Sequence, residues 1–476
     1  MNIIDYKVHE LIELVEKKQV KVREVNEAFL DNYRKIEPKV QAFLTVNEDE
    51  ILNKAEYLDK ELENGKNIGK LKGIPIGIKD NINVLDMKTT CASRMLEDFI
   101  SPYEATLVNK IKDENGIIFG KTNMDEFAIG SSGENSYFKN TRNPKDLLRV
   151  PGGSSSGSAA AVSSKEVPIA IGTDTGGSVR EPAAFCGLVG FKPTYGTISR
   201  YGVISFASTL DTVGILSSDV KDSMIMYDVL KGKDIKDATT VENKKDYNKK
   251  LFNKDLKEIK IAVPKKIFNW GLHEEVERNF KESLSVLKEC GAEIDYIDVS
   301  ALEYVLETYY VLSSAEVSSN LGRFDGIRYG KMEGTYNSTE ELYRKVRSEN
   351  FNSEVKKRIL LGTFILAKEQ HEEYYRRALK IRSKIRKEFE DIFKRYNAFI
   401  TPTTLDIAFK LGQYRNSVDM YNQDKLTVIA NLVGAPAISI PCGIKENMPL
   451  GLQVMTMCFN EEILFKIAYS FESMSK

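Results

Sequence analysis

Two loops dense in glycine and serine lie close together in this chain and constrain its fold more than any other segment. Residues 152–158 read Gly-Gly-Ser-Ser-Ser-Gly-Ser, and residues 172–178 read Gly-Thr-Asp-Thr-Gly-Gly-Ser. Glycine loses more conformational freedom on folding than any other residue, so two such loops need a structural reason. Close approach of the backbone to a reacting group, with serine hydroxyls among free N–H donors, supplies one. We therefore expect the active site here.

The composition is that of an ordinary globular chain. Of its 476 residues, 42% are hydrophobic and 29% are charged, and the net charge is −1. This balance gives no electrostatic argument for nucleic-acid binding by the whole surface. The five cysteines are scattered and none forms a Cys-x-x-Cys pair, so neither a disulfide framework nor a metal site is expected. No apolar run approaches the ~18–20 residues of a membrane span, and the N-terminus does not read as a signal peptide, so we expect a cytoplasmic protein.

Hydrophobic spacing predicts an N-terminal helical segment over residues 1–65. Apolar residues recur every three or four positions over 8–36, which is typical of one or two amphipathic helices, and a further helix is predicted over 48–64. The pattern then changes, because residues 73–79 alternate isoleucine with glycine or proline. This alternation indicates a short strand that ends at Lys79.

Helices and strands alternate in the segments that follow. A helix is predicted over 105–114 and a strand over 117–120. A further unit consists of a strand at 259–263, a helix at 274–290 and a strand at 293–299. Strands separated by helices of this length imply βαβ units and therefore an α/β fold.

Neither a nucleotide loop nor a histidine-based triad fits the sequence. Residues 152–158 contain glycines at P-loop spacing but lack the lysine that phosphate binding requires. The three histidines, His9, His273 and His371, lie in or at the start of predicted helices, where a surface or helix-terminus role is favoured. A serine nucleophile in this chain therefore needs a base other than histidine.

Lysine is the remaining candidate base, and Lys79 lies in a sequence motif that resembles one of a known family. Lys79 in Gly-Ile-Lys-Asp-Asn, Ser154 in Gly-Gly-Ser-Ser and Ser178 in Asp-Thr-Gly-Gly-Ser resemble the Ser-Ser-Lys triad of the amidase signature family. Further segments are similar to the branch of that family formed by the glutaminase subunits of tRNA-dependent amidotransferases: residues 122–131, 182–187 and 313–329.

The resemblance extends over nearly the whole chain and implies an α/β/α layered fold with a large mixed central sheet. It implies one domain, residues 1–476, with the signature core at 70–220. Residues 232–257 are polar and rich in lysine, aspartate and asparagine, and they are predicted to be a linker or a surface excursion.

The resemblance also assigns roles to the triad. Ser178 would attack the side-chain amide of glutamine, and Ser154 would pass the proton of Ser178 to Lys79. Lysine accepts a proton only as a neutral amine, so a base working near neutral pH needs its pKa lowered by about 3 units from ~10.4, roughly 4 kcal/mol. Burial behind the three isoleucines of residues 74–78 could supply much of this shift.

The second loop would provide the oxyanion hole. Its N–H donors are expected at Thr175, Gly176, Gly177 and Ser178. Taken singly, each triad residue has a structural alternative: Ser178 followed by Glu181 is a helix capping box, Ser154 suits a turn, and Lys79 suits a surface. Their combined spacing favours catalysis.

The resemblance further implies a substrate pocket for an amino acid. A free α-carboxylate calls for an arginine and a free α-amino group for a carboxylate. The matching positions are Arg358 and Asp424, with Tyr309 nearby.

The expected function is that of a glutaminase subunit, which hydrolyses glutamine to glutamate and ammonia through a glutamyl-serine intermediate. The ammonia would amidate Glu-tRNA(Gln) or Asp-tRNA(Asn) in a partner subunit that holds ATP, Mg²⁺ and most of the tRNA, within a heterotrimer of this chain and the amidotransferase B and C subunits. No cofactor is expected in this chain. The alternatives are a free-standing amidase acting on another small amide and a catalytically silent scaffold. An ion-pair clamp at Arg358 and Asp424 would be of no use for a hydrophobic amide, and the intact triad argues against a scaffold.

Three positions depart from the family pattern. Ser156 replaces a usual glycine, Glu181 replaces a usual glutamine, and the region 403–420 is compressed. We hypothesise that Glu181 adds negative charge near the site and holds Lys79 more protonated. Glu181→Gln should then move the pH–rate profile to lower pH.

Overall fold

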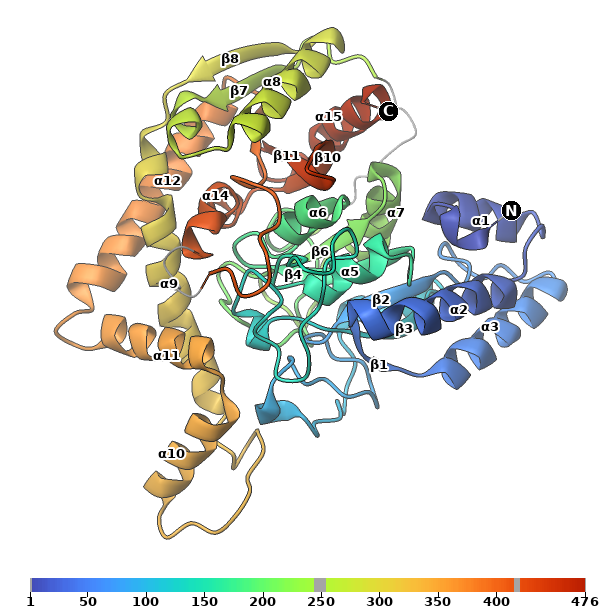
Figure 1. Cartoon of the computed structure of the whole chain (residues 1–476), viewed down its shortest axis with the longest axis horizontal. Coiled ribbons are helices and arrows are strands. Elements are labelled where there is room, and N and C mark those ends of the chain that lie inside the picture. The colour runs from blue at the N-terminus through green and yellow to red at the C-terminus, as the bar shows by residue number, and fades with distance from the viewer. Residues whose placement is uncertain (1, 244–253, 415–419, 476) are drawn as a thin grey trace.

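A mixed sheet of eleven strands runs through the computed structural model, which describes residues 2–243, 254–414 and 420–475 (Figure 1). Parallel pairs join β2 to β3 and β4, and β7 to β8 and β9, while the other neighbours are antiparallel. In spatial order the strands are β1 (Phe43–Val46), β3 (Ile117–Thr122), β2 (Pro75–Lys79), β4 (Ile169–Asp174), β6 (Thr212–Ser217), β5 (Val189–Lys192), β10 (Ala437–Lys445), β11 (Met448–Thr456), β9 (Ala398–Pro402), β7 (Lys260–Pro264) and β8 (Glu293–Ile297).

Helices cover both faces of this sheet. Successive side chains of a strand point to opposite faces, and β5 shows which helices lie on each. A Cβ at Gly190 would meet Ala183 of α6 (Arg180–Cys186). The next residue of β5, Phe191, points to the opposite face, where its ring packs against Tyr227 of α7 (Val220–Leu230) and Phe465 of α15 (Glu461–Met474). The predicted α/β/α layering is confirmed.

Most of the helices and strands predicted from the sequence are present. Residues 8–36 form two helices, α1 (Val8–Glu16) and α2 (Val22–Val40), and the predicted helix at 48–64 is α3 (Glu48–Glu63). The helix predicted at 105–114 is α4 (Thr106–Asp113), and the later βαβ unit is β7, α8 (Glu274–Glu289) and β8. The two strands of that unit are parallel neighbours, as the prediction requires.

A helical layer that the sequence analysis did not describe lies beside the sheet. It occupies one side of the molecule in Figure 1 and packs around a second apolar cluster that includes Tyr309 and Phe389. Its helices are α9 (Val305–Asn320), α10 (Thr339–Asn350), α11 (Ser353–Leu366) and α12 (Arg377–Phe393). The short α14 (Val428–Val433) connects this layer to the sheet, because Leu432 accepts a hydrogen bond from Arg382 of α12 and Asn431 donates to Asp174 of β4.

The predicted polar excursion at 232–257 is described only in part. Its described residues, 232–243 and 254–257, contain no helix or strand, and residues 244–253 lie outside the described part of the chain. Of the region 403–420, residues 415–419 likewise lie outside it. Within the ranges that the structure describes, no helix combines the length and the apolar character that crossing a membrane requires.

Candidate active site

Lys79 ends β2, which lies between β3 and β4 in the sheet, and its side chain is fully buried. Its Nζ lies 2.8 Å from Ser154 Oγ and 2.9 Å from Ser155 Oγ. It also lies 3.0 Å from Thr173 Oγ1. Burial lowers the pKa of Lys79 to about 7, although the negative charges of Asp125, Asp174 and Asp211 act in the opposite direction. A large fraction of this amine is therefore neutral near pH 7.

Ser155 is a contact of the lysine that the sequence analysis did not single out. Its hydroxyl donates to the Thr173 carbonyl over 3.2 Å and accepts the Thr173 N–H over 3.3 Å. It therefore joins the two glycine-rich loops behind Lys79. The sequence signal that could have pointed to Ser155 was its position directly after Ser154, in a run of three serines.

Ser178 lines a small, partly open cavity together with Gly176 and Phe206. The structure brings Ser154 to Lys79, but no hydrogen bond joins the Ser154 and Ser178 hydroxyls in the described ranges. The two loops are linked instead by the Ser155 N–H, which donates to the Ser178 carbonyl over 3.1 Å. The capping-box alternative for Ser178 is wrong, because α6 begins at Arg180 with Val179 as its N-cap and no side-chain cap bond.

The four N–H groups expected in the oxyanion hole differ in their partners. The Gly177 N–H already donates to Asp174 over 3.0 Å. Those of Thr175, Gly176 and Ser178 make no hydrogen bond within the part of the chain that the structure describes. Glycine is required at 176, because a Cβ there would lie 2.5 Å from the Tyr309 hydroxyl oxygen.

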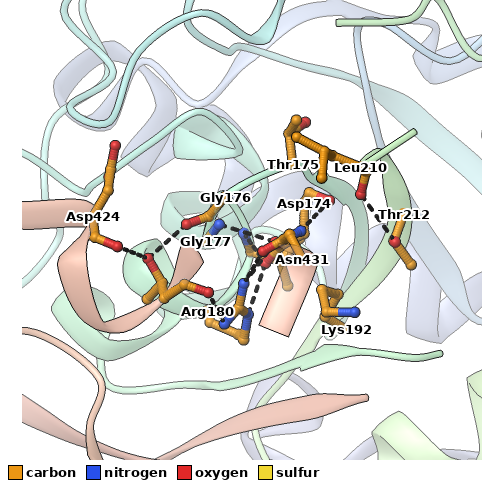
Figure 2. Close-up of polar contacts among 12 residues, drawn as sticks. Asp174, Thr175, Gly176, Gly177, Arg180, Lys192, Leu210, Thr212, Asp424 and Asn431 are labelled. Carbon is orange, nitrogen blue, oxygen red and sulfur yellow. Dashed lines mark hydrogen bonds and ion pairs between the residues drawn. The ribbon is translucent and has the colours of Figure 1, made fainter. Parts of the chain in front are cut away.

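A buried ion pair holds this loop in place (Figure 2). Both oxygens of Asp174 accept hydrogen bonds from Arg180, at 2.9 and 3.0 Å, and Asn431 of α14 donates to the same carboxylate over 2.9 Å. Arg180 also donates to the Thr427 carbonyl over 2.8 Å, and Thr427 donates to the Gly176 carbonyl over 2.6 Å. These interactions lower the pKa of Asp174 to about 2 against the effect of its burial, so the carboxylate is ionised.

The three residues expected to bind substrate line the same cavity as Ser178. Tyr309, Arg358 and Asp424 come from α9, from α11 and from residues just before α14, and all three are buried. The Arg358 Nε lies 3.1 Å from Glu354, and its guanidinium lies 4.4 Å from the centres of the Tyr310 and Tyr421 rings. Its Nη1 is buried and has no hydrogen-bond partner among the described residues, which leaves the two N–H groups of this nitrogen for a ligand.

Asp424 is held by two residues that the sequence analysis missed. Ser131 donates to one oxygen over 2.9 Å, and the Tyr310 hydroxyl donates to the other. Burial raises the pKa of Asp424 to about 6, although both hydrogen bonds and the charge of Arg358 act in the opposite direction. Ser131 lies in the segment 122–131 that carried part of the family resemblance, and that was its only signal.

The surroundings of Glu181 oppose the negative charge that the sequence analysis gave it. Its side chain is buried on α6, and one of its carboxyl oxygens has no hydrogen-bond partner among the described residues. Burial and the negative charges of Asp424, Asp125 and Asp174 raise its pKa well above the usual range. A protonated carboxyl resembles the amide that it replaces, so this direction argues against added negative charge near Lys79. The Ser156 hydroxyl is also buried without a partner, and nothing in the structure explains that substitution.

The histidines lie at helix termini or on helices away from the cavity. His273 caps α8, and His9 lies in the first turn of α1. The imidazole of His9 lies 2.8 Å from Asp222 and 3.6 Å from Asp219, a set of groups close enough to hold a metal ion. Both oxygens of Asp222, however, already accept backbone N–H groups from the first turn of α1. This cluster therefore joins α1 to α7.

Known proteins are similar to this chain over its full length. The A subunit of glutamyl-tRNA(Gln) amidotransferase from Clostridium botulinum (strain Alaska E43 / Type E3) is 51% identical over 478 residues, which cover 100% of this chain and 98% of that protein. The crystal structure of the same subunit from Thermotoga maritima superposes with a TM-score of 0.83 at 39% identity, covering 99% of this chain and 95% of that one. A peptide amidase from Stenotrophomonas maltophilia gives a TM-score of 0.83 at 25% identity, covering 98% and 96%. The family model described as Amidase matches residues 24–465, so the chain belongs to the amidase family.

Proposed function

We propose that this chain is the glutaminase subunit of a tRNA-dependent amidotransferase. The observation that carries the proposal is the convergence of Ser178, Arg358 and Asp424 on one small cavity. A serine hydroxyl, a cation and a carboxylate are the groups needed to attack the amide of a free amino acid while holding its two charged ends. Relatives about 50% identical over the full length carry the name of such a subunit.

The reaction begins with proton transfer from Ser178 through Ser154 to the neutral amine of Lys79. Ser178 Oγ then attacks the side-chain carbonyl carbon of glutamine. As the tetrahedral intermediate collapses, the proton returns through Ser154 to the amide nitrogen, and ammonia leaves a glutamyl ester on Ser178. Water, deprotonated by the same relay, hydrolyses the ester and releases glutamate.

The oxyanion is stabilised by the backbone of the second glycine-rich loop. The unpaired N–H groups of Thr175, Gly176 and Ser178 are the donors available to it. Gly177 serves the same purpose indirectly, because its bond to Asp174 orients the loop. Fixed donors of this kind need no reorganisation as the charge develops.

The amino-acid end of glutamine is held by Arg358 and Asp424. The unpaired Nη1 of Arg358 donates to the α-carboxylate, and Asp424 accepts from the α-ammonium. Tyr309 packs against Gly176 and closes the cavity between these two residues and the nucleophile.

The ammonia is used by a partner. This chain assembles with the amidotransferase B and C subunits as a heterotrimer in the cytoplasm, and it contributes no cofactor of its own. The partner holds ATP, Mg²⁺ and most of the tRNA, and there the ammonia amidates Glu-tRNA(Gln) or Asp-tRNA(Asn). Purification from native cells should therefore recover a stable complex whose glutaminase activity depends on the acceptor tRNA.

A substrate comparison separates this function from that of a free-standing amidase. Arg358→Lys should raise the KM for glutamine at least about tenfold, since a planar fork is replaced by a point charge. The same change should leave the hydrolysis of propionamide, which has no α-carboxylate, unaltered. A chain that ignores glutamine and hydrolyses propionamide equally well in both forms would contradict the proposal.

A further inference from the structure

A second hollow lies at the C-terminal end of α14, whereas Asp424 of the Ser178 cavity lies just before its start. It is an open hollow of about 410 Å³ among α12, the end of α14 and the turn that precedes α15. We call it the Arg382–Arg386 pocket. Its lining residues are Thr194, Tyr195, Thr209, Leu379, Arg382, Ser383, Arg386, Val433, Gly434, Cys458 and Phe459.

Two arginines one helical turn apart on α12 give this pocket its charge. Arg382 is fixed, because its guanidinium donates to the Leu432 carbonyl over 3.0 Å and to the hydroxyl and carbonyl oxygens of Thr209 over 2.9 and 3.0 Å. Arg386 has no hydrogen bond and no carboxylate within ion-pair distance in the ranges that the structure describes. Burial and the positive charge of Arg386 both lower the pKa of Arg382. The two guanidinium charges thus repel each other, while the carboxylate of Glu316 acts on Arg382 in the opposite direction.

The first part of α12 is strongly cationic. From Arg377 to Lys387 it carries six cationic residues and no acidic one, and Glu388, Glu390 and Asp391 follow in its last two turns. The carboxylate of Glu316 accepts the N–H and hydroxyl of Thr209 and forms no ion pair with either arginine in the described ranges. An anion entering the pocket would relieve the repulsion between the two guanidinium groups.

The other walls of the pocket combine apolar side chains with the polar groups of Thr194, Tyr195 and Thr209. Of the apolar residues, Leu379 is 39% exposed and Phe459 is 45% exposed, and Val433 also lines the pocket. Burial raises the pKa of the Cys458 thiol, so this part of the wall is uncharged. A cationic end beside an apolar wall suits a ligand that has both an anionic group and an apolar body.

We propose that the Arg382–Arg386 pocket binds a small oxyanion ligand, in which a phosphate or carboxylate is attached to an apolar or aromatic body. The oxyanion accepts hydrogen bonds from the free guanidinium of Arg386 and from the hydroxyl of Ser383. The body packs on Leu379 and Phe459. This site is separate from the cavity of Ser178 and from the activity proposed above.

Four probes test the chemistry of the site by titration calorimetry on the full chain. Phenyl phosphate and benzoate have both features, inorganic phosphate lacks the apolar body, and benzyl alcohol lacks the charge. Saturable binding is expected for phenyl phosphate, for benzoate or for both, and the comparison tells phosphate from carboxylate as the preferred group. Inorganic phosphate and benzyl alcohol should each bind at least about tenfold more weakly than the better of the two.

Variants locate the site. Arg386→Gln should weaken binding of the preferred probe at least about tenfold, and it should fold normally because Arg386 makes no contact that holds the structure. Lys384→Gln on the same helix, outside the pocket lining, is the matched control and should leave binding unchanged. Equal affinity in wild type and Arg386→Gln, competition between the probe and glutamine, or no binding of any probe at millimolar concentration would each overturn the proposal.

Discussion

The amine of Lys79 lies 2.8 Å from the hydroxyl oxygen of Ser154, at the end of a central strand and out of contact with solvent. The two residues are 75 positions apart in the sequence. Strand β2 brings the lysine to this point, and the first glycine-rich loop brings the serine. Burial supplies what the chemistry needs, because it favours the neutral amine over the ammonium.

The rate of glutamine hydrolysis should depend on pH, with the acid limb of the pH–rate profile centred near pH 7. Lys79 must be neutral to accept a proton, and its pKa is about 7, so kcat/KM should rise as the pH increases through this value. Below it the rate should fall about tenfold per pH unit. Initial rates of glutamate formation between about pH 5 and pH 9 measure the profile. A flat profile over that range would rule out Lys79 as the base.

Replacing the base should abolish activity without unfolding the chain. Lys79→Arg keeps the charge, but arginine does not lose its proton near neutral pH, so kcat should fall at least about 10³-fold. Lys192→Met is the control: Lys192 is also fully buried with its pKa lowered to about 7, but within the described residues its Nζ donates to the Pro193 carbonyl alone. That variant should keep kcat within about threefold. Similar losses of kcat in the two variants would mean that Lys79 acts through stability alone.

Glu181→Gln should leave the pH–rate profile where it is. Burial and the neighbouring carboxylates raise the pKa of Glu181 well above its usual range and so favour the neutral carboxyl, which an amide of the same shape replaces without a change of charge. The measurement is the pH at the midpoint of the acid limb, compared between wild type and the variant. A shift of the midpoint to lower pH would show instead that Glu181 is ionised and holds the proton on Lys79.

The sequence was sufficient for the parts of the site that depend on local motifs. The triad residues were predicted from the combination of their motifs and its resemblance to the amidase family, because each motif taken singly also has a structural explanation. The protonation state of Glu181 could not be predicted, because it depends on burial and on Asp424, which is more than two hundred residues away. The stacking of Arg358 on Tyr310 and Tyr421 was out of reach for the same reason: it requires the relative placement of three separate segments.

Removing the arginine that orders the catalytic loop should destabilise the fold. Arg180→Met would leave Asp174 charged and buried without its partner, which costs about 3–5 kcal/mol of the free energy of unfolding. Urea denaturation followed by circular dichroism measures the loss. Arg328→Met removes a pair with Asp325 whose arginine is 66% exposed, so it should cost no more than about 1 kcal/mol. Equal stability of the two variants would show that the Asp174–Arg180 pair does not hold the loop.

The cluster that joins α1 to α7 should make stability depend on pH through His9. Burial lowers the pKa of His9, but the hydrogen bond and charge of Asp222 outweigh it, so the folded-state pKa is raised above 6.5. Its contribution to stability is then fully present below about pH 6.5 and is lost as the pH rises through the folded-state pKa. His9→Gln should therefore lower the melting temperature more at about pH 5.5 than at about pH 8.5. His371→Gln, whose ring packs beside Tyr375, is the control and should show no such difference. The backbone N–H groups of Val8 and His9 keep their bonds to Asp222 at both pH values, so a loss that is equal at both would mean that the imidazole charge adds nothing to this junction.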